Sequence, residues 1–335
     1  MTRCAVFSAG SWGTAFAMIL ADAGNPVTLW ARRPEVAEDI NIRHENPGYF
    51  PGLVLPDAIR ATTDPAEALD GADFMVLSVP AQSLRENLTA WSPHIGPDTV
   101  LVSLMKGLEL GTAKRMTEVI REVAGVGRDR VAVVSGPNLA PEIVSRQPAA
   151  AVVASRDEDV ALRLQAACYG PYFRPYTSTD VLGCELGGVV KNVIALAVGI
   201  ADGMGFGDNT KALLLTRGLA ETTRLGAALG ADPYTFAGLA GLGDLAASCA
   251  SPASRNRTFG ANLGRGMTVS EASAAMKQTA EGVKSCAAVL ELAEQHGVEM
   301  PITETVVAIV HDGRSPEEML KELMSRSAKP ERHGH

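Results

Sequence analysis

The chain has few aromatic residues, no block of basic residues and no paired cysteines. Phe, Trp and Tyr make up 5% of its 335 residues, and the net charge is −8. Nucleic-acid-binding domains carry Lys and Arg in clusters, whereas here these residues are dispersed. The five cysteines are widely spaced, without any C-x-x-C pair, which fits a reducing cytosol and provides no zinc site. These absences predict a cytoplasmic protein with no nucleic-acid partner and no metal.

We also expect no secretory signal and no membrane-spanning apolar run. Met1-Thr2-Arg3 leads directly into a short apolar strand, without the three regions of a signal peptide. The most apolar stretch, residues 189–200, contains Lys191 and Asn192 and is too short to span a bilayer. We therefore expect no membrane insertion.

Residues 4–15 run from an apolar strand through a tight turn into a helix. In dinucleotide-binding domains such a turn brings the pyrophosphate onto backbone N–H groups at the helix N-terminus, which requires residues without a Cβ. Gly10 and Gly13 supply two of the three usual glycines, and Ser8 replaces the first. Because S-x-G-x-x-G is a weaker match than the full fingerprint, either Ser8 adopts a turn that tolerates its side chain or the loop is a coincidence.

A second strand is predicted over residues 27–30, about 20 residues past the turn, where an NAD site places an acid. Arg32 and Arg33 follow this strand instead. Two guanidinium groups would pair well with the 2′-phosphate of NADP. In the alternative interpretation they are solvated residues ahead of a helix that opens at Pro34. The pair favours NADP (NADPH) as cofactor, with NAD as the alternative.

The first half of the chain alternates strand and helix signals. Continuous apolar runs are typical of parallel strands covered on both faces, and they occupy residues 59–62, 74–79, 100–103, 131–134 and 149–154, with 173–177 as a last strand. Helices are predicted between them, for example over 113–123 and 158–168. From Val181 the pattern is helical throughout, over 186–201, 211–229, 234–247, 259–263, 270–276 and 281–296. The predicted fold class is α/β: a Rossmann-like doubly wound parallel sheet over 1–180 for the dinucleotide, then an all-helical substrate-binding domain over 181–328 and a flexible tail over 329–335.

Lysine is a better candidate than histidine for proton transfer. The six histidines lie in helical, proline-rich or terminal segments. Lys191 lies in a helix that is apolar nearly all round, so its ammonium must be paired or have a lowered pKa, and it can exchange a proton near neutral pH. Gly187 and Gly188 would allow another backbone to approach. The alternative is a lysine that snorkels to the rim of its helix.

Three further clusters combine groups that suit a phosphorylated polyol. Lys106-Gly107-Leu108-Glu109 and Ser135-Gly136-Pro137-Asn138 each follow a strand, at the carboxyl edge where open α/β sheets bind ligands. Ser254-Arg255-Asn256-Arg257 follows Gly241-Leu242-Gly243-Asp244. Guanidinium groups match phosphate, while the amides, hydroxyls and carboxylate match hydroxyl groups. Each cluster alone could be a turn or a cap.

Together these segments resemble NAD(P)-dependent glycerol-3-phosphate dehydrogenase of the bacterial type, over nearly the full length. The resemblance is carried by residues 10–15, 106–109, 135–137, 187–192, 241–244, 254–257 and 281–282, in the family's order. It implies reversible NAD(P)H-dependent reduction of dihydroxyacetone phosphate to sn-glycerol 3-phosphate, which supplies glycerophospholipid synthesis.

The resemblance also implies roles for individual residues. Lys191 would donate the proton in reduction and accept it in oxidation. The implied substrate-binding residues are Lys106, Gly136, Asn138, Asp244, Ser254, Arg255 and Asn256. The implied cofactor-binding residues are Ser11, Trp12, Arg32, Arg33, Lys106, Ala140, Arg255, Thr279 and Glu281, together with Gly10 and Gly13 of the turn. The chain departs from the family pattern at Ser8, usually Gly, at Asn138, commonly Thr or Ser, and at Pro141, often Lys.

Two other functions stay open. One is a dehydrogenase of the same layout acting on a β-hydroxy acid or a sugar acid, which would need a carboxylate-binding site. The other is a nucleotide-sensing regulatory protein without chemistry, which the presence of Lys106 and Lys191 disfavours. An exposed apolar helix face in the second domain would suit a homodimer, by fold analogy alone.

Overall fold

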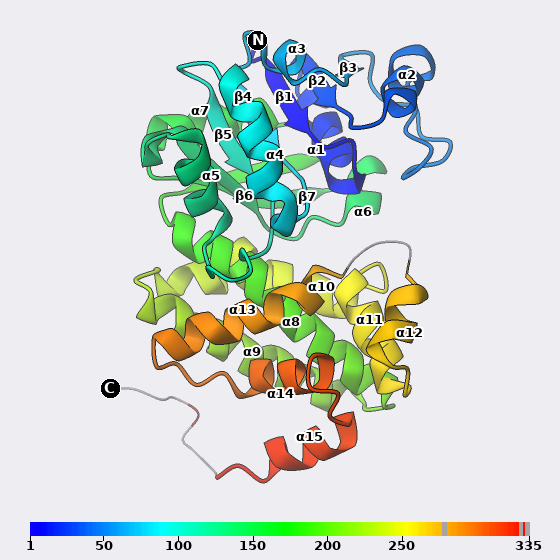
Figure 1. Cartoon of the computed structure of the whole chain (residues 1–335), viewed down its shortest axis with the longest axis vertical. Helices are drawn as coiled ribbons and strands as arrows, with labels where there is room; N and C mark the ends of the chain where they lie inside the picture. The colour runs from blue at the N-terminus through cyan, green and yellow to red at the C-terminus, as the bar shows by residue number, and fades with distance from the viewer. Residues whose placement is uncertain (277–279, 328–330, 332–335) are drawn as a thin grey trace.

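The computed structural model describes residues 1–276, 280–327 and 331, and Figure 1 shows them as two halves, one above the other. The upper half is a sheet with helices on both faces, and the lower half is built of helices. The tail predicted over 329–335 lies outside the described residues except for residue 331.

The sheet has eight strands in the order β3-β2-β1-β4-β5-β6-β7-β8. Strands β1 to β6 are parallel to one another, and their order is that of a two-halved dinucleotide-binding sheet. The α/β prediction is therefore confirmed. The strands are β1 (Cys4–Phe7), β2 (Val27–Trp30), β3 (Ile59–Thr62), β4 (Phe74–Leu77), β5 (Val100–Ser103), β6 (Val131–Ser135), β7 (Ala149–Ser155) and β8 (Phe173–Ser178).

Two strands, β7 and β8, run opposite to the other six and so depart from the prediction of a fully parallel sheet. β7 pairs antiparallel with β6, and β8 then pairs parallel with β7. The connection from β6 to β7 contains only the five-residue helix α6 (Ala140–Val144), whereas a parallel return needs a longer crossover. The apolar run at residues 149–154 indicated burial on both faces, which says nothing about direction.

Helices cover both faces of the sheet: α1 (Ser11–Asp22), α2 (Pro34–Arg43), α3 (Pro65–Leu69), α4 (Leu84–Trp91), α5 (Met116–Ala124), α6 and α7 (Glu158–Cys168). The bounds of α7 match the prediction. α5 begins later than the predicted residue 113, because Ala113 has a left-handed backbone (φ 52°) and the Glu118 carboxylate accepts from the Arg115 backbone N–H at 2.9 Å, which caps the helix there.

The lower half contains α8 (Val181–Gly203), α9 (Asp208–Ala228), α10 (Asp244–Ala250), α11 (Arg255–Gly264), α12 (Val269–Ala274), α13 (Glu281–Gln295), α14 (Pro301–Val310) and α15 (Pro316–Met324). The single helix predicted over 234–247 is wrong. That segment divides into a 3₁₀ turn (Pro233–Ala237), a π turn (Leu239–Gly243) and α10, since Gly238, Gly241 and Gly243 interrupt the helical pattern. α14 and α15 were not predicted.

α8 is the central helix of the lower half (Figure 1). Within the described ranges it is the one helix long and apolar enough to cross a membrane, but 89% of its most apolar window is buried in the fold. It is longer than the predicted apolar segment, and it packs as a core helix against neighbours on several sides. A Cβ on Gly199 would lie 2.1 Å from the Arg257 carbonyl oxygen, so α11 crosses α8 in backbone contact. This crossing places residues 254–257 beside α8.

Candidate active site

Two lysines from different halves of the molecule meet on one carboxylate. Lys191 on α8 donates to Asp244 Oδ1 at 2.7 Å, and Lys106, which follows β5, donates to Asp244 Oδ2 at 2.5 Å. The side chains are 12%, 15% and 2% exposed for Lys191, Lys106 and Asp244. Because one carboxylate faces two ammonium groups in a site with little water, the cluster favours an additional negative charge.

Lys191 is paired, as its position in an apolar helix predicted, and it also donates to Ser248 Oγ at 2.7 Å. Ser248 is a residue that the sequence reasoning missed. It stands four residues after Asp244 on α10, so both side chains lie on one helix face. That spacing is the signal that could have found it. Gly187 makes the predicted close contact, since a Cβ there would lie 2.3 Å from the Ala240 carbonyl oxygen.

The proton of Lys106 is held less tightly than that of a solvated lysine. Burial lowers its pKa to about 8, with Asp244 opposing this effect and Lys191 adding to it. Its Nζ also donates to the Gly136 carbonyl oxygen at 3.0 Å, which ties together the segments that follow β5 and β6.

A chain of amides links the lysine cluster to the rest of the lower half. Asn192 Nδ2 donates to the Lys106 carbonyl oxygen at 3.1 Å, Asn256 Nδ2 donates to Asn192 Oδ1 at 2.9 Å, and the Gly282 N–H donates to Asn256 Oδ1 at 2.9 Å. The backbone carbonyl at one end can only accept a hydrogen bond, and the backbone N–H at the other end can only donate one. These two ends therefore determine which amide group donates and which accepts in each bond between them. Asn256 is thus brought to the site, and Asn192 joins it.

The carboxyl edge of β6 presents polar atoms without partners. Ser135 Oγ and both amide atoms of Asn138 are buried and have no hydrogen-bond partner among the described residues. A buried polar group left unpaired costs about 1–3 kcal/mol, so these atoms fit a ligand that satisfies them. Asn138 and Gly136 were both predicted to bind substrate.

The remaining predicted substrate residues, Ser254 and Arg255, lie at the start of α11 and differ in exposure. Ser254 is buried, and its Oγ accepts from the Arg257 N–H at 3.3 Å, so it caps α11. Arg255 is exposed at the start of that helix. Burial raises the pKa of Glu281 at the start of α13, and the charges of Arg255, Lys191 and Lys106 oppose this rise, which places Glu281 near the cluster.

The turn after β1 fits the pyrophosphate of a dinucleotide. Gly10 is the N-cap of α1, no side chain of the described residues caps that helix, and its first turn contains no acid. The backbone N–H groups at Ser11 and Trp12 and the helix dipole are therefore available to an anion. A Cβ on Gly13 would lie 2.0 Å from the Ser8 carbonyl oxygen, so this position requires glycine.

Ser8 sits in this turn with a left-handed backbone, at φ 134°. Its Oγ accepts from the Gly10 N–H at 3.2 Å, which compensates part of the strain. Of the two interpretations of Ser8, the structure favours the one in which the turn tolerates its side chain.

Arg32 and Arg33 are exposed at the carboxyl end of β2. Arg33 Nε lies 3.6 Å from Glu35 Oε1, and Arg32 makes no hydrogen bond or ion pair within the described part of the chain. Arg33 is also the N-cap of α2, which begins at Pro34 as predicted. Ala140 begins α6 and is half-buried. Thr279 lies outside the described residues.

Comparison with known proteins relates the whole chain to one family. Two family models match, the NAD-dependent glycerol-3-phosphate dehydrogenase N-terminus over residues 3–161 and the C-terminus over residues 180–321. The chain is 73% identical to a glycerol-3-phosphate dehydrogenase [NAD(P)+] of Streptomyces griseus, with 98% of each chain covered. It is 66% identical to the protein of that name from Thermobifida fusca, with 100% of each covered. A solved glycerol-3-phosphate dehydrogenase of Coxiella burnetii superposes with a TM-score of 0.91 at 37% identity, covering 97% of this chain and 99% of that one.

Proposed function

Because this chain belongs to the NAD-dependent glycerol-3-phosphate dehydrogenase family, we propose that its lysine cluster carries out the proton transfer of that reaction. The chain is an oxidoreductase that uses NAD(P)H to reduce dihydroxyacetone phosphate to glycerol 3-phosphate. The proposal concerns which residues perform each step, and the observation that carries it is the shared carboxylate between Lys106 and Lys191.

The nicotinamide, when bound, supplies a hydride to the carbonyl carbon of the substrate. Lys191 Nζ donates a proton to the carbonyl oxygen, so the product is a neutral alcohol and the lysine regains its proton from solvent. Asp244 and Ser248 hold the ammonium in place. The positive charge of Lys106 stabilises the oxygen as negative charge develops on it. In oxidation the same groups act in reverse.

Substrate binding is assigned to the residues around the cluster. The Arg255 guanidinium suits the phosphate, to which it offers a fork of N–H donors. Asn138 and Asn256 offer amide groups to the hydroxyl and carbonyl oxygens, and Gly136 and Ser254 shape the backbone beside them. The unpartnered amide of Asn138 supports this assignment.

Cofactor binding is assigned to the first half. Residues 10–13 hold the pyrophosphate, and Ala140 and Glu281 line the binding site of the same cofactor. Arg32 and Arg33 receive the 2′-phosphate, which favours NADPH over NADH. On this proposal residues 1–180 form the dinucleotide-binding domain and 181–328 the substrate-binding domain.

We further propose a cytoplasmic enzyme without membrane insertion that supplies glycerophospholipid synthesis. The helix face of α9 that exposes Leu213, 49% accessible, supports a homodimer.

The proposed roles are tested by following NADPH absorbance with dihydroxyacetone phosphate as substrate, and then with NADH. We expect a lower KM for NADPH than for NADH, inhibition by inorganic phosphate that is competitive with the substrate, and loss of turnover when Lys191 is replaced. Turnover of a β-hydroxy acid in place of the triose phosphate would contradict the phosphate assignment.

A further inference from the structure

The loop between β5 and α5 belongs to both halves of the molecule. It carries Lys106 to Asp244, and two residues later it buries Leu108 fully among the apolar side chains of the lower half. Gly107 between them packs tightly on the upper half, since a Cβ there would lie 2.6 Å from the Ala81 Cβ. The position of Lys106 relative to Lys191 therefore depends on how this loop is held.

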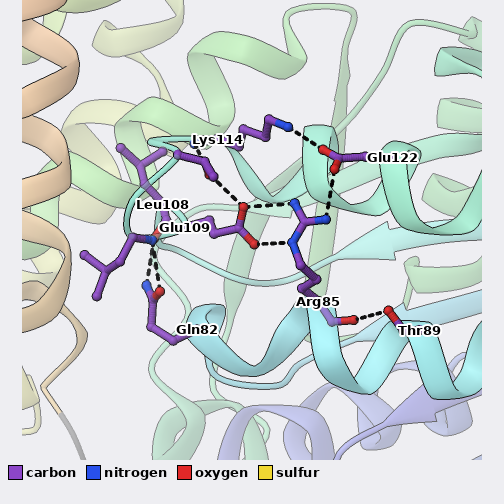
Figure 2. A network of polar contacts seen from close by, with 9 residues as sticks. Gln82, Arg85, Thr89, Leu108, Glu109, Lys114 and Glu122 are labelled. Atoms are coloured by element: carbon purple, nitrogen blue, oxygen red, sulfur yellow. Dashed lines mark hydrogen bonds and ion pairs between the residues drawn. The ribbon is translucent and has the colours of Figure 1, made fainter.

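Two side chains close to Ala81 in the sequence hold the loop between β5 and α5. Gln82 lies in a 3₁₀ turn (Ala81–Ser83), and Arg85 lies in the first turn of α4. Gln82 Nε2 donates to the Leu108 carbonyl oxygen at 2.7 Å, and its Oε1 accepts from the Leu110 N–H at 3.0 Å. Both backbone polar groups that flank Glu109 are thus bound by one amide, as Figure 2 shows.

Arg85 binds the residue between them. Its Nε and Nη2 donate to the two carboxylate oxygens of Glu109 at 2.7 and 3.0 Å, a two-point contact of fork on carboxylate (Figure 2). This contact holds the pKa of Glu109 below its usual range. We call Gln82, Arg85 and Glu109 the bracket.

The bracket has an outer neighbour that does not touch the loop segment 106–110. Glu122 on α5 accepts from Arg85 Nη1 at 3.0 Å and pairs with Lys114. It shares the arginine with Glu109 but makes no hydrogen bond to Leu108 or Leu110 in the described part of the chain. Glu122 therefore provides a matched control.

Stability alone does not account for the bracket. The Arg85 side chain is 38% exposed, and ion pairs of that exposure contribute about 0–1 kcal/mol to folding. Four hydrogen bonds with Gln82 and Arg85 nevertheless hold residues 108–110, while Asn192 holds the Lys106 carbonyl from the other side. The loop is pinned from both halves at the residues next to Lys106.

We propose that Gln82 and Arg85 are positioning residues for the reduction, because they hold the loop so that Lys106 stays on Asp244 beside Lys191. This inference rests on the proposed role of Lys106 in stabilising the developing negative charge. Within the described residues, neither side chain makes a hydrogen bond or ion pair to Lys106, Lys191 or Asp244. Their effect passes through the backbone of residues 108–110.

The test compares Arg85→Met, Gln82→Ala and Glu109→Gln in the full chain. We expect kcat to fall about 5- to 30-fold in each, since misplacements of about 1 Å cost up to 100-fold. The Kd for NADPH, measured by the quenching of tryptophan fluorescence, should change less than about twofold, because no residue of the bracket is assigned to cofactor binding. Arg85→Lys keeps the charge without the fork and should recover only part of the loss.

Two comparisons make the result specific. The double variant Arg85→Met/Glu109→Gln should be no slower than either single variant, because both changes break the same contact. Glu122→Gln should retain kcat within about twofold, since it leaves the bracket intact. If Arg85→Met does not fold, Gln82→Ala and Arg85→Lys decide the question.

The inference is overturned if the bracket variants keep parental kcat and lose only thermal stability, or if Glu122→Gln is as slow as Glu109→Gln. Lys106→Met separates this failure from that of the proposed function. If Lys106→Met loses activity while the bracket variants are normal, only the positioning role of the bracket is refuted. If Lys106→Met keeps parental kcat, the proposed role of Lys106 is refuted as well.

Discussion

The lysine cluster and the cofactor region differ in how far the fold has already arranged their side chains. Asp244 is buried, Lys106 and Lys191 are largely shielded from solvent, and both lysines are bonded to its carboxylate. Arg32 and Arg33 are exposed, and the only ion pair between them and the rest of the described chain is a 3.6 Å contact of Arg33. On the proposed roles, the groups for the chemistry are already arranged in the fold, whereas Arg32 and Arg33 would become ordered only on binding the 2′-phosphate, which costs rotamer freedom.

This contrast predicts which kinetic constant each region controls. Changes in the cluster should lower kcat, because its groups act on charge that develops in the transition state. Changes in the arginine pair should raise KM for the cofactor and leave the chemical step intact.

The largest effect is expected for Lys191→Ala. Loss of a positioned general acid lowers kcat by a factor on the order of 10² to 10⁴. The Kd for NADPH should be retained, because Lys191 lies on α8 and not in the cofactor turn. Lys284→Ala, which removes an exposed lysine of α13, is the control and should behave like the parent. Near-parental kcat in Lys191→Ala would sink the assignment.

Removal of both arginines, Arg32→Ala/Arg33→Ala, should act on binding instead. A hydrogen bond to a charged group contributes about 1.5–3 kcal/mol, so the loss of even one such bond should raise KM for NADPH about 10- to 100-fold. KM for NADH, which has no 2′-phosphate, should change far less. Arg156→Ala, at another exposed arginine, controls for net charge. Equal changes for the two cofactors would show that the pair is only a solvated surface.

The dependence of kcat/KM on pH should report the state of Lys106, whose pKa is lowered to about 8. The cation is the active form, so activity should be retained below this pH and fall as pH rises through it, approaching tenfold per unit. Asp244, Lys191 and Glu281 are the charged groups near it. Lys106→Arg stays charged and should flatten this limb of the profile. An unchanged limb in that variant would assign the titration to another group.

The sequence predicted most of the fold because burial and turns leave local signals. The apolar run at residues 100–103 predicted β5 with correct bounds. The position of Lys191 in an apolar helix predicted that its ammonium is paired or has a lowered pKa, and the structure shows the pairing. The direction of β7 left no such signal, since a strand buried on both faces reads alike in either direction. Lys106, Lys191 and Asp244 are far apart in the chain, so the meeting of the two lysines on Asp244 is a product of the tertiary fold.

The smallest effect is expected at the turn, where Ser8→Gly should stabilise the cofactor-free chain. Relief of a left-handed serine recovers about 1–3 kcal/mol, of which the greater freedom of unfolded glycine removes about 0.4–1 kcal/mol. With the loss of the bond to the Gly10 N–H, the net gain is about 1 kcal/mol, or a rise in Tm of about 2 °C. Ala9→Gly, at a neighbouring position without a left-handed backbone, should lower Tm instead. A lower Tm in Ser8→Gly would mean that the hydrogen bond of the Ser8 hydroxyl stabilises the chain more than the backbone strain destabilises it. The cofactor turn would then depend on a side-chain hydrogen bond, as the lysine cluster does.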